Sequence, residues 1–450
     1  MVHQYINNGY HIVLDVNSGA IHVVDEVVYD VISLFEKHSS EEITGLLREK
    51  YSEEEIREAV EEVAQLKEEG SLFTPDTYEA PLIDFKKRPT VVKALCLHIA
   101  HDCNLACRYC FAEEGEYHGR RALMSYETGK AALDFLIANS GSRRNLEVDF
   151  FGGEPLMNFE VVKQLVAYGR EQEKLHDKHF RFTLTTNGVL LNDDIMEFAN
   201  REMDNVVLSI DGRKEVHDHM RPFRKGAGSY DLIVPKFQKF AESRNQDKYY
   251  VRGTFTHHNL DFSNDVLHLA DLGFKQISVE PVVAADTEDY AIREEDIPQI
   301  KEEYDKLAKE MIAREKAGKG FNFFHFMIDL TGGPCVYKRL SGCGSGTEYL
   351  AVTPWGDFYP CHQFVGEEQF LMGNVDEGIT RPEIRCDFSK CNVYTKESCK
   401  DCFARFYCSG GCAANAYHFQ KDINGNYDIG CELQRKRVEC AIMIKAALAE

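Results

Sequence analysis

The stretch ALCLHIAHDCNLACRYCF, residues 94–111, decides how the rest of the chain is interpreted. Its first seven residues are mostly apolar and have the length of a buried strand. Directly after them, Cys103, Cys107 and Cys110 form a C-x3-C-x2-C pattern. Three thiols so close together can converge on one metal centre only from a loop that wraps it. Iron–sulfur clusters normally have four cysteine ligands, so three predict a cluster with one iron open to another ligand.

A tetrahedral zinc site is the alternative interpretation of this loop. Zinc requires a fourth cysteine or histidine ligand, and His101 lies two residues before Cys103. Both interpretations place a metal centre after the carboxyl end of a strand, where ligands bind in parallel sheets.

Strands and helices alternate from about residue 92 to residue 317. The expected strands are Ala94–Ala100, Leu146–Phe151, Arg181–Thr186, Asn205–Ile210, Tyr250–Thr256 and Gln276–Glu280. The helical patterns between and after them lie near residues 125–139, 159–174, 193–201, 230–243, 262–271 and 293–317. Six β/α units predict an α/β fold with a parallel sheet and right-handed crossovers, open or curled into a partial barrel.

The pattern C-x3-C-x-aromatic-C, with Tyr109 at the aromatic position, resembles the signature of radical S-adenosylmethionine (SAM) enzymes. The resemblance implies a partial (β/α)6 barrel over residues 90–320, in agreement with the six units counted from periodicity. It also implies that Cys103, Cys107 and Cys110 hold a 4Fe–4S cluster whose open iron chelates SAM, with Tyr109 beside the cofactor. In that family the reduced cluster cleaves SAM to a 5′-deoxyadenosyl radical.

Two further segments resemble SAM-binding motifs of this family. The segment FGGEP after the second strand resembles the GGE motif, so Gly152 and Gly153 are expected to approach the ligand closely and Glu154 to bind the methionine amino group. Ser209 and Arg221 lie in a stretch similar to the SxDG…R segment and are expected to contact the SAM carboxylate and ribose. Taken alone, the FGGEP segment is more typical of a plain βα turn, and the alternative for the second stretch is that Asp211-Gly212 is an ordinary turn and Arg221 a surface residue. A polar run closes the third strand and could add contacts: Thr185, Thr186 and Asn187.

The C-terminal region, residues 321–450, carries a second set of cysteines after the alternation has stopped. Seven of them fall in an ordered pattern: Cys343, Cys361, Cys399, Cys402, Cys408, Cys412 and Cys431. This pattern resembles the SPASM domain of radical SAM peptide maturases, a Cys-rich domain with two auxiliary 4Fe–4S clusters. Two zinc knuckles are the alternative.

The SPASM resemblance implies a ligand set for each auxiliary cluster. Auxiliary I would be held by Cys343, Cys361 and Cys412, and auxiliary II by Cys399, Cys402, Cys408 and Cys431. Fully ligated members have a further cysteine six positions after the first, where this chain has Tyr349. Auxiliary I is therefore expected to lack one protein ligand unless Cys335 supplies it, and the hypothesis is that a substrate thiolate binds there. Cys386 and Cys391 have no assigned role.

Residues 1–85 are predicted to form a small α+β unit. Strand-like runs at Tyr10–Asp15 and Ala20–Val24 flank a turn and indicate a hairpin. Helical patterns follow near Glu26–Glu36, Ser40–Lys50 and Ser52–Glu69, with N-caps expected at Ser39 and Ser52, and residues 74–89 are predicted to be a linker. The unit resembles the winged-helix-like RiPP recognition element, which binds the leader of a ribosomally synthesised peptide as an added strand. A generic accessory domain or a DNA-binding winged helix are the alternatives.

The composition limits the compartment and the partners. With 52 Lys and Arg against 74 Asp and Glu, the net charge is −22, which disfavours nucleic-acid binding. No apolar run is long enough to span a membrane, and the first fifteen residues are too polar for a signal peptide, so we expect a cytoplasmic protein. Cytosolic conditions disfavour disulfides among the 15 cysteines, and the isolated Cys96 and Cys440 are expected to be small buried hydrophobes.

Together the three regions resemble the maturases that form thioethers in SCIFF peptides (six cysteines in forty-five residues). The resemblance implies SAM and three 4Fe–4S clusters as cofactors, a ferredoxin- or flavodoxin-type reductant, and a Cys-rich precursor peptide as substrate. A peptide cysteine would be joined to a carbon of an acceptor such as threonine. A formylglycine-forming sulfatase maturase is disfavoured by His362, which stands where those enzymes carry an Asp base. A peptide epimerase, a carbon–carbon cross-linker and a non-catalytic electron-transfer or zinc scaffold protein are further alternatives.

Overall fold

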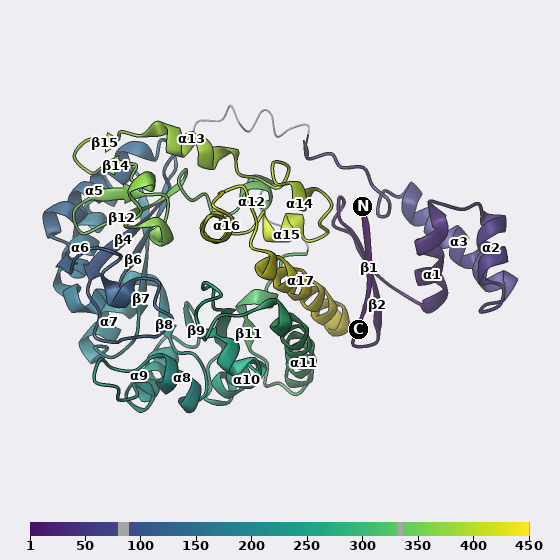
Figure 1. Ribbon diagram of the computed structural model, residues 1–450, viewed down its shortest axis with the longest axis horizontal. Helices are drawn as coiled ribbons and strands as arrows, with labels where there is room; N and C mark the ends of the chain where they lie inside the picture. The colour runs from purple at the N-terminus through teal and green to yellow at the C-terminus, as the bar shows by residue number, and fades with distance from the viewer. Residues whose placement is uncertain (80–89, 331–335, 450) are drawn as a thin grey trace.

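The computed structural model describes residues 1–79, 90–330 and 336–449, and these ranges form three regions (Figure 1). An N-terminal unit projects from the body, a strand–helix lobe makes up most of the body, and the cysteine-rich region lies between the two. Cys335 and most of the predicted linker lie outside the described residues.

The N-terminal unit is a three-stranded antiparallel sheet with three helices. Its elements are β1 (Val2–Asn7), β2 (Tyr10–Asp15), β3 (Ile21–Val24), α1 (Glu26–Phe35), α2 (Ser40–Leu47) and α3 (Glu53–Glu68). The β2–β3 hairpin is confirmed, and Ser39 and Ser52 cap α2 and α3 through capping boxes. Strand β1 is not among the predicted strands, because three of its six residues are polar. The signal for it is the Asn8-Gly9 turn to β2, where φ is 49° and 87°, as a tight hairpin turn requires.

The lobe is built on one sheet in the order β11-β10-β9-β8-β7-β6-β4-β12-β13-β14-β15, with β5 paired to β4. The strands of the lobe are β4 (Ala94–His101), β5 (Ala122–Leu123), β6 (Asn145–Gly152), β7 (His179–Thr186), β8 (Met203–Ser209), β9 (Tyr249–Phe255), β10 (Gln276–Pro281) and β11 (Asn322–Phe323). Neighbours from β4 to β11 pair in parallel, so the predicted α/β fold with a parallel sheet is confirmed.

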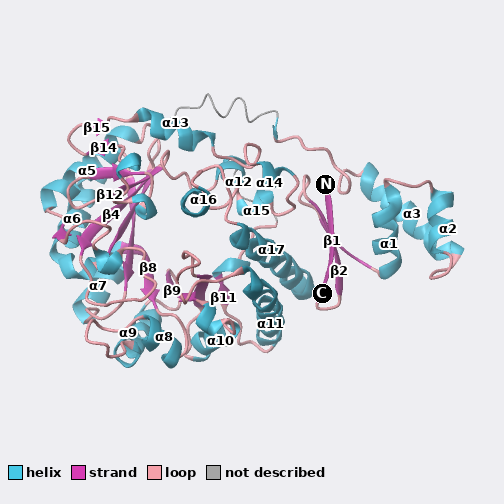
Figure 2. Cartoon of the chain, in the orientation of Figure 1, coloured by secondary structure: helices cyan, strands magenta, loops and turns pink. Residues whose placement is uncertain are grey.

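Helices cover the outside of this sheet, as Figure 2 shows. They are α5 (Tyr126–Asn139), α6 (Phe159–His176), α7 (Asp193–Glu202), α8 (Lys214–Met220), α9 (Tyr230–Ser243), α10 (Ser263–Asp271) and α11 (Ile297–Lys316). Alternation along each strand separates the two faces of the sheet. On β7, Phe180 and Phe182 are fully buried beside Gly169 of α6. Thr185, near the end of the same strand, lies on the opposite face of the sheet and lines the cavity described below. The helix-facing side thus holds the core, and the inner side keeps polar groups for a site.

The cysteine-rich region continues the same sheet. Its elements are α12 (Val336–Ser341), β12 (Tyr349–Val352), β13 (Asp357–Tyr359), β14 (Gly373–Asn374), β15 (Gly378–Ile379), α13 (Pro382–Lys390), α14 (Glu397–Lys400), α15 (Arg405–Cys408), α16 (Ala413–Gln420) and α17 (Asp428–Ala449). Strand β12 pairs in parallel with β4, the strand that precedes the cysteine loop. The four short strands are not among the predicted elements, because two to four residues are too few to show a period.

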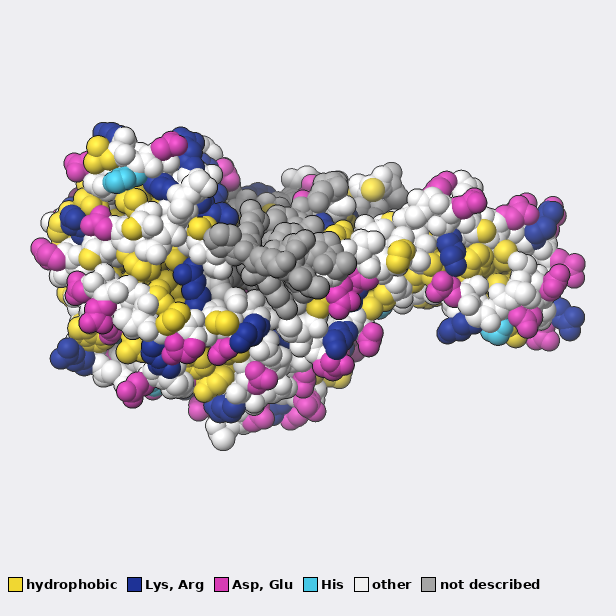
Figure 3. Space-filling model, turned by 90° about the horizontal axis from the view of Figure 1, so that it is seen from above, with side chains coloured by type: hydrophobic (Ala, Val, Ile, Leu, Met, Phe, Trp, Pro, Cys, Tyr) yellow, Lys and Arg dark blue, Asp and Glu magenta, His cyan; other side chains and the backbone are white. Residues whose placement is uncertain are grey.

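Charge and hydropathy agree with the composition. On the face in Figure 3, acidic and basic side chains are interspersed over the N-terminal helices rather than forming a basic stripe. Within the described ranges, no helix combines the length and the apolar character that crossing a bilayer requires.

Candidate functional site

A cavity of about 280 Å³ opens at the carboxyl ends of the parallel strands. The three thiols Cys103, Cys107 and Cys110 line it, from the loop after β4. The structure places all six residues expected to contact SAM on its wall: Tyr109, Gly152, Gly153, Glu154, Ser209 and Arg221. The polar run at the end of β7, Thr185 to Asn187, lines it as well. Segments more than 100 residues apart in sequence therefore meet at one site.

The three thiols of the loop fit a metal centre. Burial raises the pKa of Cys103 to about 12 and that of Cys107 to about 11, and the neighbouring Cys110 thiol raises both further. Because neighbouring thiolates repel one another, these buried thiols lose their protons only when a cationic centre binds them. No group of three or more His, Cys, Asp or Glu side chains in the described ranges is close enough to share a single ion. Three thiols match the ligand number of a cluster with one open iron, in which each thiolate binds a different iron.

His101 does not join the cysteine loop. Its Nε2 lies 3.0 Å from Nδ1 of His98, and its ring stacks on Tyr117 with centroids 4.6 Å apart. It is buried and lies outside the lining of the cavity. The structure therefore gives the zinc alternative no fourth ligand from this histidine.

Glu154 is held in place by three donors. Its carboxylate accepts hydrogen bonds from Thr186 Oγ1 at 2.8 Å, from the amide of Asn187 at 2.8 Å and from the amide of Leu156 at 3.0 Å. Burial nevertheless raises its pKa to about 7. A buried carboxylate of this kind is completed by a cationic partner such as an ammonium group.

The two glycines before Glu154 are required by the neighbouring backbone. A Cβ at Gly152, where φ is +126°, would lie 2.3 Å from the carbonyl oxygen of Ala100, and one at Gly153 would lie 2.2 Å from that of Asp102. The turn is thus packed against the start of the cysteine loop, a reason for glycine that differs from the predicted close approach to a ligand.

Tyr109, Asp211 and Arg221 form a buried polar triad. The Tyr109 hydroxyl donates to the Asp211 carboxylate at 2.7 Å and accepts from Arg221 Nη1 at 2.8 Å. Arg221 and Asp211 also form an ion pair at 3.8 Å. Burial raises the pKa of Asp211 to about 6, and Arg221 opposes that shift. Sequence reasoning read Asp211 only as part of a turn, but its place directly before Gly212 in the SxDG segment is the signal for it.

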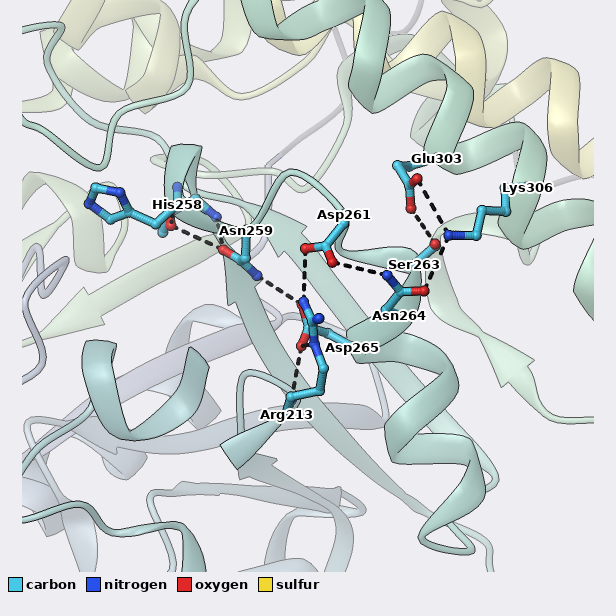
Figure 4. A network of polar contacts seen from close by, with 10 residues as sticks. Arg213, His258, Asn259, Asp261, Ser263, Asn264, Asp265, Glu303 and Lys306 are labelled. Atoms are coloured by element: carbon cyan, nitrogen blue, oxygen red, sulfur yellow. Dashed lines mark hydrogen bonds and ion pairs between the residues drawn. The ribbon is translucent and has the colours of Figure 1, made fainter. Parts of the chain in front are cut away.

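The segment after β8, which carries Asp211 and Arg221, is fixed to α10 by a second network (Figure 4). The fully buried Asp265 accepts hydrogen bonds from Arg213 Nε at 2.8 Å and from the Arg213 amide at 2.9 Å. Asn259 Nδ2 donates to its other oxygen at 3.0 Å. A Cβ at Gly212, where φ is +143°, would lie 2.3 Å from the Asp265 Cβ. Only glycine lets the loop approach Asp265 so closely, and this anchor positions Ser209 and Arg221.

The opposite wall of the cavity contains residues that are not among the predicted SAM contacts. Strands β9 and β10 and the segment after Cys361 provide Arg252, Thr254, Glu280, Val282, Val283, His362 and Gln363. Burial lowers the pKa of His362 to about 4, so its imidazole is neutral at pH 7. The signal for the strand residues is their period-two spacing near the carboxyl ends of two predicted strands.

The cysteines of the C-terminal region fall into two neighbourhoods. Besides burial, the thiols of Cys412 and Cys343 raise the pKa of Cys361. Similarly, Cys399 and Cys402 raise the pKa of Cys408, and Cys408 and Cys399 that of Cys431. These effects link Cys361 to Cys343 and Cys412, and Cys408 and Cys431 to Cys399.

The remaining cysteines lie outside these two groups. Cys96 and Cys440 are fully buried, as expected. Cys386 is exposed on α13, and Cys391 lies in a small hollow that Cys343 also lines. Tyr349, which stands at the position expected for a further cysteine, forms a side-chain hydrogen bond with the Cys96 thiol. All cysteines in the described part of the chain are free thiols.

Comparison with known proteins finds a family match within the lobe. Residues 97–258 match the profile of the Radical SAM superfamily. An uncharacterised protein of Methanocaldococcus jannaschii is 29% identical over 64% of this chain and 90% of its own length. The radical SAM cyclopropyl synthase TigE of Paramaledivibacter caminithermalis is 23% identical, covering 71% of this chain and 68% of its own. The serine-type anaerobic sulfatase-maturating enzyme of Klebsiella aerogenes is 23% identical, covering 75% and 83%.

Two solved structures share the fold. The structure of anSMEcpe with bound AdoMet and Cp18Cys peptide has a TM-score of 0.63 and 18% identity, covering 80% of this chain and 99% of its own. Streptococcus suis SuiB bound to precursor peptide SuiA has a TM-score of 0.54 and 16% identity, covering 94% and 97%. The chain therefore carries a radical SAM domain at residues 97–258, and its relatives include anaerobic sulfatase-maturating enzymes and a radical SAM cyclopropyl synthase.

Proposed function

We propose that this protein is a radical SAM maturase that forms thioether bonds in a Cys-rich precursor peptide. One observation carries the proposal: the cavity lined by the three-thiol loop is also lined by His362, which directly follows Cys361 of the second thiol set. A peptide in this cavity would thus lie between a site that generates a radical and a site that binds sulfur.

The residues on the cysteine-loop side of the cavity are proposed to hold SAM and its cluster. Cys103, Cys107 and Cys110 bind the 4Fe–4S cluster, and Glu154 binds the SAM amino group. Ser209 and Arg221 contact its carboxylate and ribose, while Tyr109 and the glycine turn shape the wall. The chain supplies these groups already oriented, since Glu154 and Arg221 each have neutral or oppositely charged partners that fix them.

The C-terminal thiols are proposed to hold two auxiliary clusters, which gives three in all. Auxiliary I would be bound by Cys343, Cys361 and Cys412, and auxiliary II by Cys399, Cys402, Cys408 and Cys431. Tyr349 occupies the position of a fourth auxiliary I cysteine, and its hydroxyl is hydrogen-bonded to the Cys96 thiol. Auxiliary I then has a coordination site free for a thiolate of the peptide.

The proposed reaction balances as a two-electron oxidation of the peptide. The cysteine loses its thiol proton, and the acceptor residue, for example threonine, loses a hydrogen atom from carbon as the new C–S bond forms. When bound, SAM and the clusters supply the 5′-deoxyadenosyl radical that takes this hydrogen atom and an acceptor for the remaining electron. The product is two hydrogens lighter, and a ferredoxin- or flavodoxin-type protein supplies the electron that cleaves SAM.

The N-terminal unit is proposed to bind the leader of the precursor as an RiPP recognition element. Strand β1 is one edge of its sheet, and its side chains pack against α17, since Tyr5 donates to the Glu439 carbonyl at 3.0 Å and His3 Nε2 lies 2.9 Å from the Glu439 carboxylate. Strand β3 is the other edge of the sheet and could take a further strand. The anSMEcpe structure covers 80% of this chain, and the uncovered fifth is about as long as residues 1–85. The SuiB structure, which is bound to a precursor peptide, covers 94% of this chain. The larger coverage by SuiB supports a precursor peptide with a leader as the substrate.

Formylglycine formation is the second candidate, favoured by the sulfatase-maturating relatives. His362 stands where an Asp base is expected, and as a neutral imidazole facing the cavity it could accept a proton in that reaction. An epimerase or a carbon–carbon cross-linker would use the same cofactors without consuming a thiol.

The test is a mass measurement on a six-cysteine precursor peptide incubated anaerobically with reconstituted enzyme, SAM and dithionite. Thioether formation predicts a loss of two hydrogens together with one fewer alkylatable cysteine. Formylglycine made from serine also loses two hydrogens but leaves every thiol alkylatable and creates an aldehyde, and epimerisation leaves the mass unchanged. The Cys386→Ala variant serves as the control, because this exposed cysteine lies in neither thiol set.

A further inference from the structure

The cavity has two halves, and only one of them is used by the proposed SAM site. The second half is formed by β9, β10 and the segment after β10, with an ion pair, Arg252 and Glu280, among apolar side chains. Arg252 is the cross-strand neighbour of Ser209 on β8, so the ion pair begins where the SAM half ends.

The geometry of this ion pair leaves groups free to bind a ligand. Arg252 Nε and Nη2 lie 3.1 Å and 2.9 Å from the same oxygen, Oε1 of Glu280. Within the described residues, Glu280 Oε2 and Arg252 Nη1 have no hydrogen-bond partner in the protein. The side chains are 34% and 49% exposed, respectively, on the wall of the cavity. The pair thus presents one acceptor and one donor side by side.

The charge of this pair is maintained at neutral pH. Burial acts to raise the pKa of Glu280, but Arg252 and then His325 outweigh it and lower the pKa to about 2. Val282 and Val283 continue from β10 along the same wall, with Val283 38% exposed. A charged donor–acceptor edge beside an apolar strip matches an extended peptide, which offers a carbonyl, an N–H and a side chain in turn.

We propose that Arg252 and Glu280 bind the backbone of the substrate peptide and position the residue to be modified in front of the cysteine loop. Arg252 donates to a peptide carbonyl, and Glu280 Oε2 accepts from a neighbouring peptide N–H. Both are positioning residues, because neither touches the reacting atoms. The inference rests on the proposed function in taking a peptide as the substrate.

The experiment compares Glu280→Gln and Arg252→Lys with the wild-type holoenzyme. Both variants keep the size of the side chain, but one removes the charge and the other removes the planar guanidinium. The matched control is Glu147→Gln, which breaks an ion pair with Arg181 on neighbouring strands β6 and β7 outside the cavity. Cluster content by electron paramagnetic resonance, SAM affinity, peptide KM and the ratio of modified peptide to 5′-deoxyadenosine are measured for all four proteins.

We expect each cavity variant to raise the peptide KM, or lower the ratio of product to deoxyadenosine, by about tenfold, the loss of one charge-assisted hydrogen bond. Cluster spectra and SAM affinity should stay at the wild-type level, and Glu147→Gln should match the wild type throughout.

Two results would overturn the inference. A loss of SAM affinity with unchanged peptide parameters would place the pair in the SAM site, and equal effects of Glu147→Gln would show only a loss of sheet stability. If the wild type releases deoxyadenosine in response to peptide but forms no thioether, the proposed function fails on its own. In that case the peptide dependence of deoxyadenosine release still gives the peptide KM. Comparing this KM between the variants and the wild type shows whether Arg252 and Glu280 bind the peptide.

Discussion

At the residue scale, the cavity is organised by buried carboxylates that each have a defined set of partners. Glu154 has three donors and a pKa raised to about 7 by burial, while Asp211 has Tyr109 and Arg221. Asp211 forms an ion pair with Arg221 at 3.8 Å, whereas the proposed partner of Glu154 is the ammonium group of SAM. Asp211 therefore has a structural role, and Glu154 has a proposed role in ligand binding.

The Glu154 carboxyl predicts a pH dependence of SAM binding. Below pH 7 this carboxyl carries a proton in the SAM-free protein, and binding an ammonium group must displace it. SAM affinity should therefore fall about tenfold for each pH unit below 7 and level off above it. Isothermal titration of SAM between pH 5.5 and 8.5 measures this. In Glu154→Gln the affinity should be lower and independent of pH, and a flat wild-type profile would contradict the assignment.

The Tyr109 hydroxyl predicts a stability effect. Tyr109→Phe removes the donor to Asp211 at 2.7 Å and leaves a fully buried carboxylate short of a partner. The free energy of unfolding should fall by about 1–3 kcal/mol, the cost of an unsatisfied buried group. Urea denaturation checks it, with Tyr51→Phe as the control, since that hydroxyl binds Asp30 near the surface. Equal losses in the two variants would mean that Asp211 does not depend on Tyr109.

At the element scale, the strands bring the site together, and the turns after them are each locked to a neighbour. The GGE turn rests on the backbone of the cysteine loop, and the turn after β8 rests on Asp265 of α10. A turn that carries ligand-binding groups therefore depends on a residue outside the cavity.

The Asp265 anchor predicts that a change in α10 weakens SAM binding. Asp265→Asn removes the charge that the Arg213 guanidinium and amide contact, and breaking a buried pair costs about 3–5 kcal/mol. Stability should fall by that order, and SAM affinity should fall with it as Ser209 shifts. Asp261→Asn is the control, because that carboxylate also pairs with Arg213 but is 41% exposed. Unchanged SAM affinity in a folded Asp265→Asn protein would show that the network does not position the loop.

Most elements of the lobe follow from periodicity, and those that do not are short or polar. Strand β4 and strands β6 to β10 are largely buried runs long enough to show their pattern, and the caps of α2 and α3 in the N-terminal unit are local signals. Strands β12 to β15 exist only because the sheet edge beside β4 gives them a partner. Such tertiary pairing leaves no trace in a window of four residues.

At the scale of the whole molecule, the N-terminal unit is docked on the loop between two proposed auxiliary II ligands, Cys402 and Cys408. His3 stacks on Phe403 with centroids 3.5 Å apart, and Arg405 pairs with Asp76 at 2.8 Å. Sequence reasoning finds the cysteine spacing and the N-terminal unit but not this contact, because its partners lie more than 300 residues apart. For the same reason it finds Glu154 and Arg221 through a family motif but misses Arg252 and Glu280, which only the folded sheet brings to the cavity.

The docking contact predicts that the unit can be released without unfolding it. Arg405→Ala removes a buried guanidinium that also contacts Asn17 at 2.9 Å. The radius of gyration from small-angle X-ray scattering should rise, and product formation should fall while the affinity for the leader peptide is kept. Asp30→Asn, which breaks a surface ion pair within the unit, should change none of these. A compact Arg405→Ala protein with full activity would contradict a coupling through this contact.

The central claim is that a hydrogen atom leaves the peptide for the deoxyadenosyl group as a cysteine sulfur is joined to carbon. The most direct measurement uses a precursor whose core carries deuterium at all carbon positions, incubated anaerobically with the enzyme, SAM and reductant. We predict one deuterium in 5′-deoxyadenosine for each cysteine that becomes resistant to alkylation. Deoxyadenosine without deuterium, or deuterium transfer with every thiol still alkylatable, would contradict the claim.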